Sequence, residues 1–166
     1  MMKINYNPDG KWSVESVQKR YRELSLVYGG VGDFFPEPKV YINQRGAMWT
    51  YNIMKSVVDG VQLGDKACIQ LSIEYIQDNL VASTTGYIRE RMARALCTAE
   101  LSNSQKKALV NVFLTMLENG NLQQQFREYI RLFKYIGIEP YLKDIERYRL
   151  SEKQYIRRAA EKLLTK

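Results

Sequence analysis

Ser104 and Lys107 stand three residues apart, a spacing at which a lysine can activate a serine hydroxyl as a nucleophile. The serine belongs to the stretch "LSNSQKK" (101–107), which has the composition of a helix start, where serine is common as an N-cap. A Ser-x-x-Lys spacing also arises often by chance. We therefore expect a structural role for this serine and no nucleophilic chemistry.

Two carboxylates, Glu74 and Asp78, fall one turn apart in a stretch with helical periodicity. Such a pair can bind a cation or act as general acid and general base. An exposed acidic face gives the same spacing, so an enzyme with acids from the 59–78 region is kept only as a third hypothesis. The glycine-rich "GGVG" (29–32) is not followed by Gly-Lys-Ser/Thr, so it is not a P-loop.

The sequence contains no histidine and only two cysteines, Cys68 and Cys97. The lack of histidine excludes Ser-His and Cys-His nucleophiles and all metal sites that use imidazole. Two thiolates are too few for a structural zinc site within one chain. We therefore predict a protein without catalysis, cofactor or metal. The isolated cysteines are typical of free thiols in the cytoplasm.

Basic residues exceed acidic ones, 25 against 18, which gives a net charge of +7. The excess is uneven, because residues 127–166 have a net charge of +5 and residues 1–126 only +2. A basic segment favours a polyanionic partner such as DNA or RNA, although charge also serves solubility. The absence of an apolar run of about 20 residues predicts no membrane span, and "MMKINYNPDGKW" at the start predicts no secretory signal.

The tripeptide Tyr-Ile-Arg occurs three times, starting at residues 87, 129 and 155. The spacings of 42 and 26 residues do not sustain a repeat. Helical periodicity turns the isoleucines inward and gathers basic side chains on outward faces. The predicted nucleic-acid or anion-binding residues are Arg127, Arg131, Lys134, Arg157, Arg158 and Lys162, and a secondary basic face holds Tyr87, Arg91 and Arg94.

Capping signals and apolar periodicity predict the helices. We expect helices over 13–28, 44–59, 65–82, 86–99, 103–118, 122–136, a short one from Pro140, and 152–165. The expected caps are Ser13 and Gly29, Asp65, the "ASTTG" break (82–86), Ser102 with Gln105, and Ser151 with Gln154. The stretch "KVYI" (39–42) is a short strand or an extended link.

These elements predict an all-α fold of about seven to eight helices, arranged as an irregular bundle or as a HEAT-like stack of antiparallel helix pairs. The length predicts one domain over 1–166, with an N-terminal helix and Pro/Gly-rich link in 1–43 and a helical core in 44–166. Our leading hypothesis is a non-catalytic interaction module that binds another protein or a second copy of itself. The alternative is nucleic-acid binding through the basic C-terminal helices.

Overall fold

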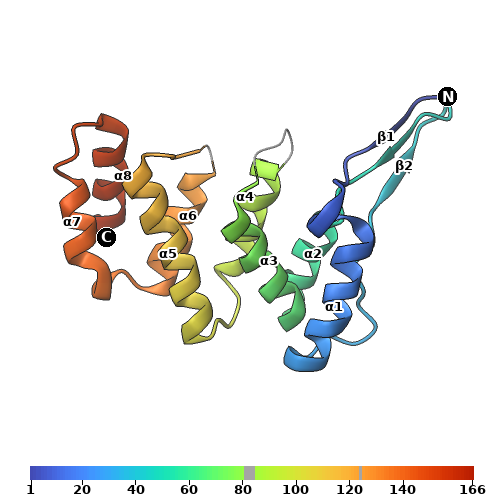
Figure 1. The fold of residues 1–166 in the computed structure, drawn as a ribbon, viewed down its shortest axis with the longest axis horizontal. Helices are drawn as coiled ribbons and strands as arrows, with labels where there is room; N and C mark the ends of the chain where they lie inside the picture. Colours follow the sequence, from blue (N-terminus) through green and yellow to red (C-terminus); the bar gives the residue numbers. More distant parts are fainter. Residues whose placement is uncertain (81–84, 124) are drawn as a thin grey trace. The chain divides into compact units, whose positions relative to one another are not determined.

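The computed structural model describes residues 1–80, 85–123 and 125–166 (Figure 1). These residues form eight α-helices, two short 3-10 helices and one three-stranded sheet. The all-α class is confirmed, with the sheet as a small addition. The contacts divide the chain into two compact units, residues 1–74 and 75–166, which we describe separately.

In the first unit, a 3-10 turn (Gly10–Trp12) leads into helix α1 (Val14–Tyr28). The predicted caps of this helix are confirmed. Ser13 Oγ accepts a hydrogen bond from the backbone N–H of Ser16 at 3.2 Å, and Gly29 ends the helix. These bonds satisfy backbone groups that an α-helix leaves unpaired at its ends.

The sheet of the first unit contains strands β1 (Lys3–Asn5), β2 (Val40–Ile42) and β3 (Met48–Thr50), in the order β1-β3-β2. Strand β1 is parallel to β3, and β2 is antiparallel to β3. The strand alternative for "KVYI" is therefore confirmed. The strands extend away from α1 and the other helices of this unit (Figure 1).

The helix predicted from residue 44 is wrong in its first half, because α2 spans Met54–Gln62. Asn43 Oδ1 accepts from the backbone N–H groups of Arg45 and Ala47, and Gly46 has a φ of +77°, so the chain turns tightly here and returns as β3. Asn52 Oδ1 accepts from the N–H of Met54 at 2.9 Å, which marks the true start of the helix.

Helix α3 (Lys66–Asp78) begins at the predicted cap, since Asp65 Oδ1 accepts from the N–H of Cys68 at 2.9 Å. The helix ends four residues earlier than predicted, and Asn79 follows it with a positive φ of 44°. The predicted break at 82–86 lies largely outside the described residues, which resume at Thr85.

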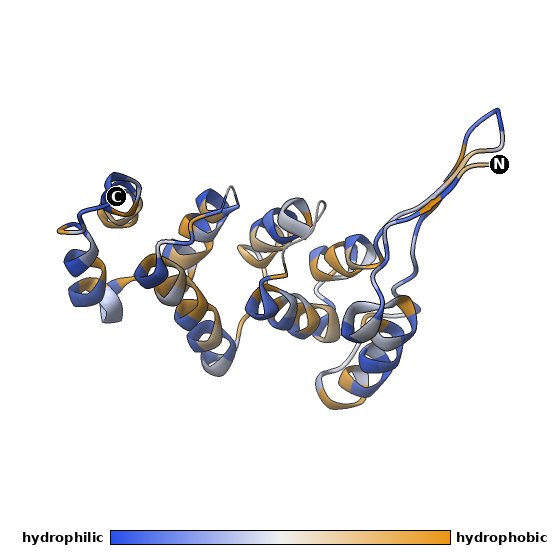
Figure 2. Ribbon diagram, turned by 45° about the horizontal axis from the view of Figure 1, so that its top comes forward, coloured by the Kyte–Doolittle hydropathy of each residue, from blue (hydrophilic) through white to orange (hydrophobic). Residues whose placement is uncertain are grey.

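The second unit contains α4 (Thr85–Leu96), α5 (Asn103–Asn119), α6 (Phe126–Ile136), a 3-10 turn (Glu139–Tyr141), α7 (Leu142–Tyr148) and α8 (Gln154–Leu164). Helix α6 contacts α4, α5 and α8, and α7 packs against α8 and α5. The helices carry both hydrophobic and hydrophilic residues, as expected of amphipathic helices (Figure 2). The core between them includes Met92, Leu109, Phe113, Phe133 and Leu163.

The ends of α5 agree with the sequence. Ser102 and Gln105 form a reciprocal capping box, and Gly120 ends the helix in the left-handed conformation with a φ of +67°. The same pattern fails at α8, where Ser151 Oγ accepts from the N–H of Lys153 and makes no capping bond to the helix. Within the described residues, no helix is long and apolar enough to cross a membrane.

Candidate functional site

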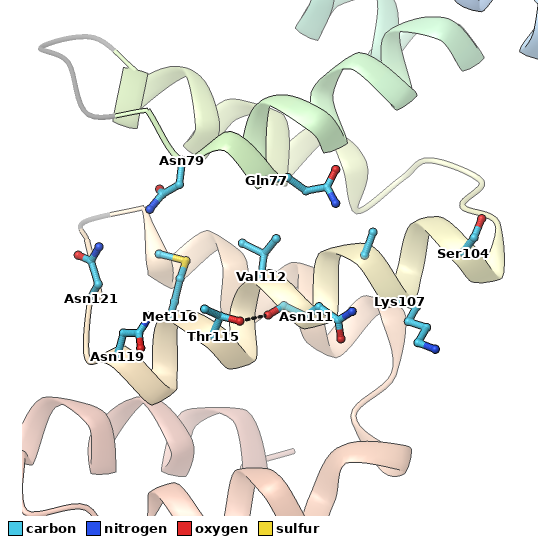
Figure 3. A pocket seen from close by; sticks show the side chains of 11 residues that line it. Gln77, Asn79, Ser104, Lys107, Asn111, Val112, Thr115, Met116, Asn119 and Asn121 are labelled. Carbon is cyan, nitrogen blue, oxygen red and sulfur yellow. Dashed lines mark hydrogen bonds between the residues drawn. The ribbon is translucent and has the colours of Figure 1, made fainter.

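A groove on the second unit is lined by helix α5 and by the residues at the end of α3 (Figure 3). Its volume is about 570 Å³. We call it the amide groove, because five of its eleven lining residues carry a carboxamide. The lining residues are Gln77, Asn79, Ser104, Lys107, Ala108, Asn111, Val112, Thr115, Met116, Asn119 and Asn121.

Helix α5 contributes two parallel rows of side chains to this groove. Residues 107, 111, 115 and 119 form a polar row of Lys, Asn, Thr and Asn, and all four are exposed. Residues 108, 112 and 116 form an apolar row of Ala, Val and Met. The rows exist because residues four apart lie nearly above one another on an α-helix. The groove therefore has a polar edge beside an apolar floor.

Gln77 and Asn79 lie across the groove from α5 (Figure 3). Asn79 follows α3 in a left-handed conformation, which places its short polar side chain at the turn. Its Oδ1 atom is buried, and no hydrogen-bond partner for it is present among the described residues. A buried acceptor without a partner is costly, so this wall of the groove holds one polar atom that the described residues leave unsatisfied.

The predicted basic residues do not gather in one place. Arg127 and Arg131 of α6 converge on Glu128, and Arg94 of α4 joins them. The nitrogen-to-carboxylate distances are 3.6 Å, 3.1 Å and 3.4 Å, respectively. Arg94 of the secondary basic face therefore meets Arg127 and Arg131 of α6 at one carboxylate, that of Glu128. Arg94 also pairs with Glu90 at 2.7 Å.

Glu128 is buried, since only 1% of its side chain is exposed. Burial alone would raise the pKa of this carboxyl group. Hydrogen bonds from Arg94 and Arg131, together with their charges, outweigh burial and hold the pKa below its usual value. The arginines themselves remain more than half exposed.

Lys134 of α6 and Arg157 of α8 form hydrogen bonds at opposite ends of α8. Lys134 Nζ donates to the carbonyl oxygen of Thr165 at 2.6 Å, just after the helix. Arg157 donates to the carbonyl oxygens of Ser151 and Glu152, just before it. Arg158 and Lys162 are exposed on α8. In the secondary basic face, the guanidinium of Arg91 lies 6.0 Å from the ring centroid of Tyr87. The six predicted residues therefore do not form one compact cluster.

Arg89, which was not among the predicted site residues, is only 1% exposed. This guanidinium donates to the carbonyl oxygen of Leu80 and to Gln123 Oε1, the latter at 2.8 Å. No carboxylate in the described part of the chain forms an ion pair with it. The sequence could have indicated that Arg89 is buried, because it shares a helix face with the buried Ala93 and Leu96.

The residues singled out for chemistry have ordinary partners. Ser104 Oγ lies 3.1 Å from Ser102 Oγ, while Glu74 pairs with Arg20 and accepts a hydrogen bond from Gln70. Among the residues that the structure describes, no three acidic or cysteine side chains gather as metal ligands would. Comparisons of the sequence with protein-family models, curated proteins and solved structures found no match.

Proposed function

We propose that the protein is an interaction module whose amide groove binds an extended peptide segment of a partner protein. The observation that carries this proposal is the polar row of α5 beside its apolar row. A carboxamide has both donor and acceptor groups, and so does each residue of a peptide backbone. Asn111 and Asn119 can therefore bond to the backbone of a bound segment whatever its side chains are.

The spacing of the row fits an extended chain. Four residues of α-helix rise about 6 Å, and two residues of an extended strand span about 6.6 Å. From Lys107 to Asn119, α5 rises about 18 Å, which about six extended residues cover with a mismatch of roughly 2 Å. Successive polar residues of the row can thus meet every second residue of the peptide.

The remaining lining defines the peptide further. Alternate side chains of a strand point to one face, so those facing α5 would rest on Ala108, Val112 and Met116. We expect small or medium apolar residues at these positions. Lys107 is the only ionisable residue among the described residues that line the groove, so an acidic residue fits at that end. A lining with one ionisable group also supports binding over acid-base catalysis.

The nucleic-acid alternative at α6 has less support. The three positive charges of Arg94, Arg127 and Arg131 are opposed by the two negative charges of Glu90 and Glu128. These five side chains together thus have a net charge of only +1. The guanidinium groups of Arg94 and Arg131 are also already engaged in hydrogen bonds to these carboxylates.

A phage-displayed library of random dodecapeptides tests the proposal. Peptides enriched on the wild-type protein should bind the double variant Asn111→Ala/Asn119→Ala at least tenfold more weakly, since two hydrogen bonds are worth about 1 kcal/mol each. Asn103→Ala, an exposed asparagine at the start of the same helix, is the matched control and should bind normally. Failure to enrich any peptide, or equal binding by the double variant, contradicts the proposal.

A further inference from the structure

The register of the N-terminal sheet places four aromatic residues on one face. Ile4, Trp49 and Tyr41 form one row across β1, β3 and β2. Side chains two residues apart along a strand point to the same face. Tyr6 and Tyr51 follow Ile4 and Trp49 by two residues, so their side chains lie on the same face, in the next row. We call Tyr6, Tyr41, Trp49 and Tyr51 the aromatic face.

The rings of the aromatic face lie in two pairs. Tyr41 and Trp49 have ring centroids 5.6 Å apart with planes tilted by 37°, and Tyr6 and Tyr51 are stacked 6.2 Å apart within 11° of parallel. Tyr41 is 54% exposed. Core aromatic residues such as Phe113 are fully buried, whereas these rings keep accessible surface on strands that extend away from the helices of the first unit (Figures 1 and 2).

The charge around the aromatic face is positive. Residues 1–6 and 39–51 include Lys3, Lys39 and Arg45, all exposed, and no aspartate or glutamate. Asp59 of α2 offsets one of these charges through a 2.8 Å ion pair with Lys39. A further cation, Lys55, lies 4.5 Å from the ring centroid of Tyr51. Exposed rings surrounded by more cations than acids favour a ligand that has both flat faces and negative charge.

We propose that the aromatic face binds single-stranded nucleic acid. The unpaired bases stack on Tyr41 and Trp49, and Lys55 and Arg45 contact phosphates. Every base has a π-face, so such binding tolerates different sequences. A duplex does not fit, because its bases are already stacked on one another. This site is separate from the amide groove, and neither proposal depends on the other.

Tryptophan fluorescence reports on this site directly. The chain has two tryptophans, and Trp12 is buried. Oligothymidylate and oligouridylate should therefore quench Trp49, whereas a DNA duplex of the same length should not. The two single-stranded probes distinguish DNA from RNA. Affinity should fall between about 50 and 200 mM salt, and Lys55→Gln and Arg45→Gln should each lower the salt slope by about 0.7.

Matched variants at Tyr41 decide whether the ring itself binds. Tyr41→Phe keeps the ring and should bind as the wild type does, while Tyr41→Val keeps strand propensity and should bind about tenfold more weakly. Tyr28→Val, at the exposed end of α1, is the control and should have no effect. The proposal is overturned if Trp49 is not quenched, if Tyr41→Val binds normally, if Arg127→Gln/Arg131→Gln abolishes binding, or if a proline-rich peptide quenches Trp49 in place of the oligonucleotides.

Discussion

Tyr21 Oη donates a hydrogen bond to Asp65 Oδ2 at 2.6 Å, which joins α1 to the N-cap of α3. The same carboxylate oxygen accepts from the N–H of Val31 at 3.0 Å, and Oδ1 caps the helix through Cys68. Asp65 is fully buried, so these bonds replace its hydration. Burial, reinforced by the bond to Asp65, raises the pKa of Tyr21, which therefore stays protonated and keeps donating across the neutral range.

Tyr21→Phe should destabilise the first unit by about 1–2 kcal/mol, because it removes one donor from a buried carboxylate while preserving the ring. Urea unfolding followed by tryptophan fluorescence measures this, since both tryptophans belong to the first unit. Tyr28→Phe, at an exposed tyrosine on the same helix, should change little. Equal stability of Tyr21→Phe and the wild type would show that the 2.6 Å bond contributes nothing.

Gly60→Ala should also destabilise the first unit, although alanine normally favours a helix. An added Cβ would lie 2.3 Å from Cys68 Sγ and 2.7 Å from the ring of Phe34, so the core must shift, at a cost of about 1–3 kcal/mol. Cys68→Ala removes the nearer obstacle. The double variant should therefore lose less stability than the sum of the single variants.

The control for this prediction is Gly86→Ala in α4, where the added carbon meets only Gln125 Oε1 at 3.4 Å. This substitution should be neutral or stabilising by less than about 1 kcal/mol. Strict additivity of Gly60→Ala and Cys68→Ala would mean that the two side chains do not compete for the same space.

Glu128→Gln should remove part of the pH dependence of stability. The folded-state pKa of Glu128 is below its usual value, so its contribution is present above the unfolded-state pKa, about 4.3, and is lost as pH falls through the folded-state pKa. The variant should be less stable by about 1–2 kcal/mol at pH 7 and should differ little from the wild type at the lowest pH.

Urea unfolding followed by far-UV circular dichroism between pH 7 and pH 2.5 measures this difference. Glu100→Gln, an exposed acid of the second unit, should keep the acid dependence of the wild type. A difference between Glu128→Gln and the wild type that stays constant with pH would mean that the carboxylate charge is not what stabilises the cluster.

Arg89→Met should destabilise the second unit by about 2–3 kcal/mol, because the carbonyl of Leu80 and the amide of Gln123 lose a charged donor inside the protein. Arg89→Lys should fall between this variant and the wild type, since an ammonium group does not reproduce both bonds of a planar guanidinium. Arg158→Met, at an exposed arginine, should stay within about 0.5 kcal/mol of the wild type.

Local signals in the sequence predicted most helix ends. Ser13, Asp65 and Ser102 bond to backbone groups three residues away, so the sequence alone reveals these caps. Strand β3 was missed because its conformation depends on pairing with β1, which lies far away in the sequence. The burial of Glu128 likewise depends on residues far away in the sequence, since part of its compensating charge comes from α4.

The amide groove was only partly visible in the sequence. Ser104 and Lys107 attracted attention as a nucleophile pair, yet both line the groove. The four-residue spacing of Lys107, Asn111 and Asn119 could have shown the polar row. The opposite wall could not be predicted, because Gln77 and Asn79 precede α5 by more than twenty residues and reach it only through the packing of the second unit.

The parallel pairing of β1 with β3 has a consequence for synthesis. Lys3 pairs with Met48, which is 45 residues later in the chain. A ribosome that adds about 5–20 residues per second needs roughly two to nine seconds to make that distance. During this interval Ile4 and Tyr6 have no native strand beside them. The first strand of the nascent chain is thus made early and reaches its partner late, whereas α5 and α6 can pair as soon as both have emerged.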